Sequence, residues 1–387
     1  MSIAVISSQR LSLLVSLVCL VASASLIAAP AIAVDKTKAG KSDPKLGAHL
    51  QLRHSFQPPL HLPGFADSAL ENDPELGVNA LRLRRARLWL SWAHGAWKMK
   101  LKIAFDDLAP ALQDAWAETG LWRGAVVRLG RTKRVYSGSF LISSRHQRLL
   151  ERAEVSDLAW HGRDLGVRMR QHLWHKRIEL WAMVSNGAGV FDEVRPHLRY
   201  EARFDVMPLG SLDLGDPHIG RKAKVRIGAG ATAWRLHEEH KTGKQILLAR
   251  YHDRSAFSCI AALRWQGVEL SGEGFLGESA PIDARSQAAV DGGVGNDPTT
   301  NFQGAYGQLA AQIPGLRDLL IAARYQVWLQ EIGESQARND RLELAASWLF
   351  DKEDVKAQLQ WRREVDRPAS GAETTAWEIQ AQLQVLL

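Results

Sequence analysis

The chain has 387 residues and a formal net charge of +7, a length that can form one large core or two domains. It has two cysteines, and only Cys259 lies beyond residue 33. If the first 33 residues are removed on export, as argued below, no intramolecular disulfide can form. Beyond residue 33, no stretch approaches the roughly 18 uninterrupted apolar residues of a membrane-spanning helix, so the sequence argues against a helical membrane protein.

The first segment has the three parts of a secretory signal peptide. Arg10 supplies a positive charge, residues 11–29 are mostly apolar, and Ala31-Ile32-Ala33 forms a small-residue cleavage site. The alternative is an uncleaved membrane anchor, but an anchor would not require the small-residue cleavage site at residues 31–33. We therefore expect residues 1–33 to be a signal peptide and residues 34–387 to form a single exported domain.

Apolar and polar residues then alternate along most of the remaining chain. Between residues 97 and 106 the apolar positions are separated by Lys98, Lys100 and Lys102. Successive side chains of a strand point to opposite faces, so each such run has one apolar and one polar face. In chain order the runs predict strands near residues 46–55, 80–93, 96–106, 112–119, 124–132, 164–173, 177–186, 197–206, 223–235, 244–253, 257–265, 268–276, 304–313, 319–329, 340–350, 355–364 and 375–387.

These runs give seventeen candidate strands, whereas single-chain bacterial barrels have an even number. We therefore expect one assignment to be wrong and the number to be sixteen. Short connections such as residues 93–95 and 266–267 are typical of periplasmic turns. The Gly- and Ser-rich stretch 277–302 is typical of a mobile extracellular loop. Other long connections are expected at residues 57–79, 133–163, 190–196 and 207–222.

Two properties of the runs favour a transmembrane antiparallel β-barrel over a soluble β-sheet protein. The strands are about ten residues long, which suits a tilted membrane span. Their polar faces are densely charged, and the interior of a small soluble barrel could not hold so many ions, whereas a water-filled lumen could. The expected fold is thus all-β, a barrel with its ionic side chains facing water in the lumen.

The polar faces carry more basic than acidic residues. Arg168 and Arg170 on one run are typical, and Lys98, Lys100 and Lys102 on another repeat the pattern. Basic side chains lining a pore concentrate anions and repel cations. The alternative is that basic and acidic side chains pair across the lumen. We expect pairing together with a net positive path, and hence an anion preference; a nucleic-acid partner is not expected for an exported chain.

The run Arg82-Leu83-Arg84-Arg85-Ala86-Arg87 does not fit a regular strand. Adjacent Arg84 and Arg85 cannot both face the lumen, and the apolar positions change parity between Leu83 and Leu88. A β-bulge or a strand end would reconcile both observations.

Several short motifs, in shared order and spacing over roughly residues 46–210, resemble the phosphate-selective porins (the porin O and P family). They are Arg84-Arg85-Ala86-Arg87-Leu88, Leu112-Gln113-Asp114-Ala115-Trp116, Leu129-Gly130-Arg131-Thr132-Lys133, Ser143-Ser144-Arg145, Leu150-Glu151-Arg152, Arg163-Asp164-Leu165-Gly166-Val167 and Ser185-Asn186-Gly187. The resemblance implies a sixteen-stranded barrel, usually a homotrimer, whose long third loop folds inward as a constriction. It also implies that Arg84, Arg85 and Asp114 line the constriction, with Ser144 and Arg145 supplied by the inward loop.

The chain departs from that family at two positions. Phe140 stands where phosphate-selective members carry a lysine, and Arg87 replaces an aromatic residue of the lumen. The expectation is therefore a passive porin in the outer membrane of a Gram-negative bacterium, without catalysis, metal or cofactor. Its partners would be outer-membrane lipid and small anionic solutes such as phosphate. The alternatives are an outer-membrane hydrolase or a secreted soluble β-sheet binding protein. The expected pore-lining residues are Arg84, Arg85, Arg87, Asp114, Ser144, Arg145, Arg168 and Arg170.

Overall fold

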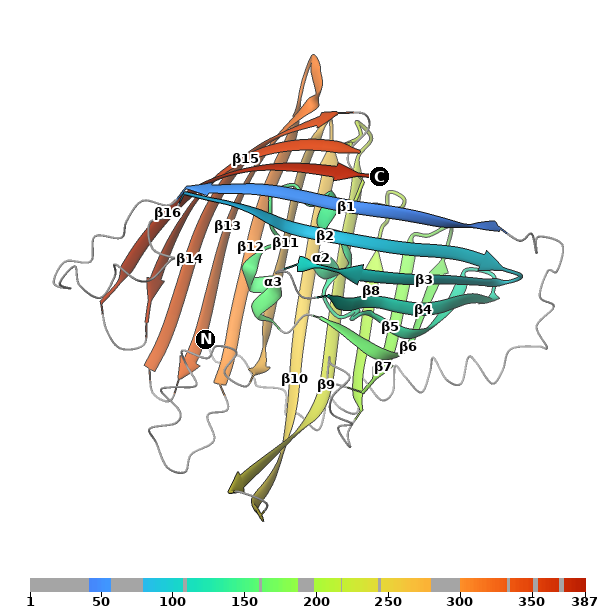
Figure 1. The fold of residues 1–387 in the computed structure, drawn as a ribbon, viewed down its shortest axis with the longest axis vertical. Helices are drawn as coiled ribbons and strands as arrows, with labels where there is room; N and C mark the ends of the chain where they lie inside the picture. The colour runs from blue at the N-terminus through green and yellow to red at the C-terminus, as the bar shows by residue number, and fades with distance from the viewer. Residues whose placement is uncertain are drawn as a thin grey trace.

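The computed structural model describes residues 42–56, 79–106, 110–159, 162–186, 198–216, 218–242, 245–279, 300–332, 335–350, 354–368 and 372–387. The expected signal peptide and the long connections at 57–78, 190–196 and 280–299 lie outside the described residues. Sixteen strands form one closed antiparallel barrel (Figure 1). They are β1 Ser42–Phe56, β2 Asn79–His94, β3 Trp97–Ala104, β4 Ala111–Trp122, β5 Ala125–Lys133, β6 Arg163–Leu173, β7 Ile178–Ser185, β8 Arg199–Val206, β9 Lys224–Thr242, β10 Gln245–Trp265, β11 Val268–Ser279, β12 Thr300–Ile313, β13 Leu316–Ile332, β14 Ser335–Phe350, β15 Val355–Arg367 and β16 Thr374–Leu386.

Each strand pairs with its neighbours in sequence, and β1 pairs with β16 to close the barrel, from His49 opposite Leu386 to Phe56 opposite Ile379. The predicted number of sixteen is confirmed. The surplus candidate came from residues 244–253 and 257–265, which form the single strand β10. Its ladder with β9 continues through Asp253, Arg254 and Ser255. These polar residues interrupt the apolar alternation, but none of them is a glycine or proline that would turn the chain.

The alternation in sequence corresponds to the two faces of the wall. On β1, His49, Gln51 and Arg53 face the interior and are buried, while Leu50 and Leu52 are exposed on the outside. The same arrangement holds around the barrel, because the period of the side chains on every strand is two residues.

The arginine run on β2 contains the irregularity that the sequence predicts. Gln51 of β1 lies opposite Arg85, and the next residue, Leu52, lies opposite Leu83, so Arg84 has no partner in the ladder. One extra residue in β2 shifts the parity at this point. Leu81, Leu83 and Leu88 are therefore all exposed on the outside, and the bulge is confirmed.

The connections differ between the two ends of the barrel. At the end where β1 begins and β16 finishes, turns such as residues 95–96 and 266–267 are tight. One connection at this end is long: residues 207–223, between β8 and β9. We call it the floor segment; residue 217 is not described. The sequence marked this stretch as a long connection but gave no sign that it folds back into the barrel.

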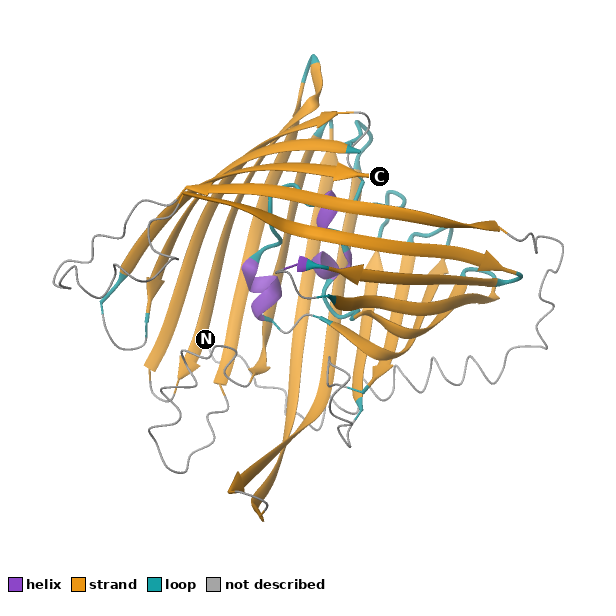
Figure 2. Ribbon diagram, viewed as in Figure 1, coloured by secondary structure: helices purple, strands orange, loops and turns teal. Residues whose placement is uncertain are grey.

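At the other end, the connection between β5 and β6 enters the barrel, as the resemblance implied. Its described residues 134–159, here the inward segment, contain α2 Gly138–Leu141, the 3-10 helix η4 Ser144–His146 and α3 Glu154–Leu158. Figure 2 shows these short helices within the outline of the strands. Among the described residues, no helix is long and apolar enough to cross a membrane.

Part of the inner wall is apolar, which corrects the expectation that ionic residues line it throughout. Trp234, Phe275, Phe302 and Trp328 face inward from β9, β11, β12 and β13 and pack with Val155 of α3. The rings of Phe302 and Trp328 stack with centroids 4.9 Å apart. The physical reason is that the inward segment covers this side of the barrel. The wall side chains here therefore pack against protein and not against water.

Candidate functional site

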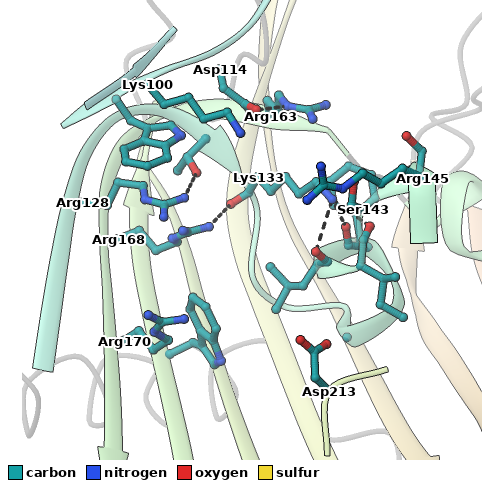
Figure 3. A pocket seen from close by; sticks show the side chains of 18 of the residues that line it. Lys100, Asp114, Arg128, Lys133, Ser143, Arg145, Arg163, Arg168, Arg170 and Asp213 are labelled. Carbon is teal, nitrogen blue, oxygen red and sulfur yellow. Dashed lines mark hydrogen bonds and ion pairs between the residues drawn. The ribbon is translucent and has the colours of Figure 1, made fainter. Parts of the chain in front are cut away.

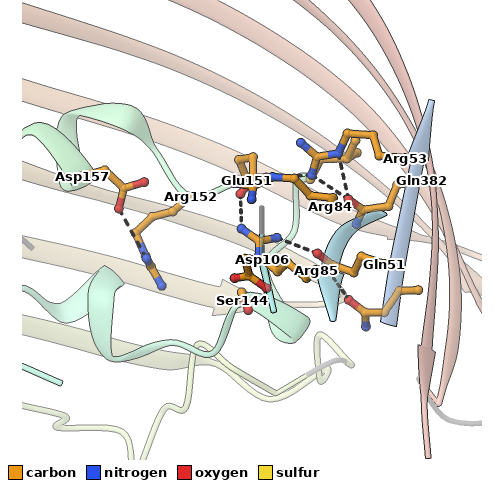
Figure 4. A network of polar contacts seen from close by, with 12 residues as sticks. Gln51, Arg53, Arg84, Arg85, Asp106, Ser144, Glu151, Arg152, Asp157 and Gln382 are labelled. Atoms are coloured by element: carbon orange, nitrogen blue, oxygen red, sulfur yellow. Dashed lines mark hydrogen bonds and ion pairs between the residues drawn. The ribbon is translucent and has the colours of Figure 1, made fainter. Parts of the chain in front are cut away.

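One carboxylate, that of Glu151, attaches the inward segment to the bulge of β2. The Arg53 and Arg84 guanidinium groups each lie 2.8 Å from a Glu151 oxygen, and Arg85 pairs with the other oxygen (Figure 4). Burial alone would raise the pKa of Glu151, but the charges of Arg85, Arg53 and Arg84 outweigh burial and hold the pKa well below its usual range. The bulge thus lets two adjacent arginines reach one loop carboxylate.

Further contacts hold the same segment to the opposite wall. Arg324 of β13 donates to the Glu151 carbonyl from two nitrogens, both at 3.1 Å. The Glu273 carboxylate of β11 accepts hydrogen bonds from the backbone nitrogens of Gly138 and Ser139 at 2.8 and 3.0 Å. The segment is therefore attached to both sides of the barrel and divides the interior.

The floor segment reaches the inward segment from the other end. Glu269 of β11 lies between Arg148 of the inward segment and Arg264 of β10, with oxygen–nitrogen distances of 3.0 Å to each. Both arginines also donate to floor-segment carbonyls: Arg148 to Asp216 at 2.7 Å and Arg264 to Asp213 at 3.1 Å. Apolar contacts add to this linkage, since floor-segment side chains are buried in one cluster with Ile260 and Ala262, against which Ile142 packs.

Between these two segments and strands β1–β7 and β9 lies a cavity of about 650 Å³. Its lining contains thirteen lysines and arginines against three carboxylates, those of Asp114, Glu179 and Asp213. Figure 3 shows Arg128, Arg168 and Arg170 one below the other along one side, with Ser143 and Arg145 across from them. The cavity is therefore strongly electropositive, with Asp213 at its floor.

Several of these cations have no carboxylate within 4.0 Å among the described residues. Lys100 and Lys102 of β3 lie near the Asp114–Arg163 pair, whose own atoms are 2.6 Å apart. Arg168 donates to the Lys133 carbonyl at 3.3 Å instead of to an acid. Seven of the thirteen lining cations have no carboxylate partner among the described residues: Lys100, Lys102, Lys133, Arg145, Arg168, Arg170 and Lys176.

Aromatic rings take the place of carboxylates beside part of this basic wall. The guanidinium groups of Arg168 and Arg170 lie 5.1 and 5.3 Å from the centre of the Trp181 ring. The Arg128 guanidinium lies 3.7 Å from the Trp116 ring centre and also pairs with Glu118 at 2.6 Å. A cation over an aromatic face is stabilised without being neutralised. The wall thus keeps its positive charge.

Seven of the eight residues predicted from the sequence line the cavity: Arg85, Arg87, Asp114, Ser144, Arg145, Arg168 and Arg170. Arg84 is outside the lining, because the bulge directs it to Glu151. Arg87 pairs with Asp106 and donates to Ser144 at 2.9 Å. The positions are therefore as expected for seven residues, while the binding role of each stays a prediction.

Some residues of the lining could not be selected from any pattern in the sequence. Lys133 ends β5, and its ammonium group donates to the carbonyls of Phe140 and Ile142, both at 2.8 Å, beside the Phe140 ring. Asp213 belongs to the floor segment, which has no strand periodicity to place it. Lys100, Lys102, Glu179 and Arg226 carried a usable signal, since they lie on the polar faces of alternating runs.

Among the described residues, no group of His, Cys, Asp or Glu side chains is arranged to hold a metal ion.

The sequence matches no protein-family model and no curated protein. Its structure is similar to that of the outer-membrane channel DcaP of Acinetobacter baumannii, with a TM-score of 0.56 and 10% identity over 92% of this chain and 100% of that one. The anion-selective porin from Comamonas acidovorans has a TM-score of 0.56 and 10% identity over 90% and 100%. The trimer form of OmpT, an outer-membrane protein of Vibrio cholerae, has a TM-score of 0.56 and 10% identity over 89% and 99%. At these identities the likeness establishes the fold, and this chain shares the barrel fold of these outer-membrane proteins.

Proposed function

We propose that this chain is a passive outer-membrane porin with a preference for anions. The observation that carries the proposal is the electropositive cavity between the inward and floor segments, with thirteen basic residues against three acidic ones. Walls of low dielectric constant focus the field of such residues, which raises the local concentration of anions and lowers that of cations.

The outer surface supports a membrane location. Thirty-eight large apolar side chains of the described residues are exposed, and most of them alternate along the strands. A contiguous apolar exterior of this extent is unfavourable in water and favourable in lipid. This observation weighs against the alternative of a secreted soluble binding protein. The export signal predicted at residues 1–33 would bring the chain to the outer membrane.

The expected size of the preference follows from five of the cations without a carboxylate partner: Lys100, Lys102, Arg145, Arg168 and Arg170. Lys133 is left out because its ammonium group donates to backbone carbonyls, and Lys176 because it lies in the turn between β6 and β7. At roughly 7 Å in water each stabilises a passing monovalent anion by about 0.6 kcal/mol. Screening at 0.1 M salt reduces this by about half, because the Debye length is then about 10 Å. Five such charges together give about 1.5 kcal/mol, which is roughly a tenfold enrichment of anions.

Three finer points belong to the same proposal. The solutes would be small anions, of which phosphate is one expected from the resemblance to phosphate-selective porins. The assembly would be a homotrimer, an expectation supported by the trimer form of the similar OmpT. The barrel would act without catalysis or cofactor; an outer-membrane hydrolase remains the alternative function, and no arrangement in the cavity favours it.

The test is the reversal potential of the refolded chain in a planar bilayer under a tenfold KCl gradient. An anion-selective potential is expected, and Arg168→Gln with Arg170→Gln should lower the chloride-to-potassium permeability ratio about threefold. Arg363→Gln, at an exposed position away from the cavity, is the matched control. A cation-selective potential would refute the anion preference, and absence of conductance would refute the pore.

A further inference from the structure

The cavity has two walls of different chemistry. One wall is basic and belongs to the barrel, with Arg168 and Arg170 on β6 flanking the Trp181 ring. The inward segment contributes the apolar side chains of Leu141 and Ile142 to the lining, and Figure 3 shows Ser143 and Arg145 of this segment across from the arginines of β6. Leu141 packs against the cluster that contains Trp181. A solute in this space therefore meets both cations and hydrocarbon.

Apolar side chains also form part of the floor. Met207 and Leu212 lie at the edge of the cavity but are only 2% and 1% exposed, and they belong to the buried cluster against which Ile142 packs. The floor segment thus supports Ile142 from behind, while Leu141 and Ile142 present the hydrocarbon to the cavity. Chloride or phosphate, which are charged over their whole surface, would leave this wall unused, whereas an anion with a hydrocarbon body would cover it.

The cations of the basic wall are suited to a carboxylate. A guanidinium group is weakly hydrated and presents a planar fork that matches the two oxygens of a carboxylate. Arg168 and Arg170 are held beside an indole ring and have no carboxylate partner among the described residues, so they keep their charge for a solute. The volume of about 650 Å³ lies within the range of roughly 300–1,000 Å³ that small-molecule sites occupy.

We propose that the cavity is a binding site for small carboxylates that carry an apolar ring, which it selects over inorganic anions and over short carboxylates. The carboxylate binds at Arg168 and Arg170, and the ring lies against Leu141 and Ile142. This inference rests on the proposed pore function and names the class of solute that the pore takes. Burying roughly 50 Å² of ring surface would strengthen binding about tenfold relative to a carboxylate without a ring.

The experiment measures how added anions block the chloride current of the refolded chain in a planar bilayer. Benzoate, acetate and inorganic phosphate are the probes, and bilayers without protein control for effects on the lipid. Benzoate is expected to reach half-block at about one tenth of the acetate concentration and below the phosphate concentration. Equal or stronger block by acetate or phosphate would overturn the inference.

Two variants test the site independently. Leu141→Ser removes hydrocarbon from the inward segment, and Trp181→Leu removes the ring between the two arginines; each should reduce the benzoate-to-acetate ratio severalfold. Trp97→Leu, on the outer face of β3, is the matched control and should keep the ratio. If Leu141→Ser and Trp181→Leu both keep the ratio of the unchanged chain, the assignment of the site is wrong. A chain that conducts no chloride, or prefers potassium, fails before any benzoate is added and refutes the pore proposal itself.

Discussion

Replacing Glu151 by glutamine should release the inward segment from the bulge of β2. The carboxylate is shared by Arg53 and Arg84, each at 2.8 Å, and by Arg85. Removing one partner of a buried ion pair costs about 3–5 kcal/mol, because the remaining charge stays buried without compensation. The Glu151 side chain is 26% exposed, whereas that of Arg53 is only 2% exposed, so we take the lower end of that range. About 3 kcal/mol corresponds to a roughly 150-fold larger population of barrels with an undocked segment.

Single-channel recording measures this population directly. With the segment undocked the pore is wider, so the time spent in high-conductance openings should rise by about two orders of magnitude in Glu151→Gln. Asp157→Asn is the control on the same segment: Asp157 is 56% exposed and, among the described residues, forms an ion pair only with Arg152, at 3.4 Å. An exposed ion pair contributes about 0–1 kcal/mol. The time that the Asp157→Asn variant spends in high-conductance openings should therefore change less than about fivefold. Equal effects of the two variants, or none from Glu151→Gln, would refute the role of Glu151 as the anchor.

Two further predictions concern the same segment. The pKa of Glu151 is lower in the docked state than that of a free glutamate, so its contribution to docking is complete above about pH 4.3 and weakens as the pH falls below that value. High-conductance openings should therefore be constant from pH 8 to pH 5 and become frequent only in stronger acid; an increase between pH 7 and pH 5 would contradict this. Second, a Cβ on Gly230 would lie 1.9 Å from the Tyr136 carbonyl oxygen, whereas one on Gly307 would meet open space. Gly230→Ala should lower the free energy of unfolding by about 1–3 kcal/mol and Gly307→Ala by much less, as measured by denaturant titration in detergent; equal effects would show that the segment does not press on β9.

The sequence determines the barrel because the necessary signal is local. Each strand is encoded by an alternation that is visible within about ten residues, and the outward position of Leu50 or Leu52 follows from it. The bulge is equally local, since Arg84 and Arg85 are adjacent and the apolar parity changes beside them. The surplus strand shows where this reading fails: Asp253 and Arg254 look like an interruption, but the hydrogen bonds to β9 continue through them.

Only the tertiary structure decides how the lumen is divided. Glu151 meets Arg53 and Arg85 from far along the chain, and Glu269 joins Arg148 to Arg264 across two segments that enter from opposite ends. No periodicity places such irregular segments, because their positions depend on side-chain packing and ion pairs between residues distant in sequence. For this reason the sequence supplies the basic wall of the cavity, whereas the apolar wall and the floor exist only once the barrel has closed around both segments.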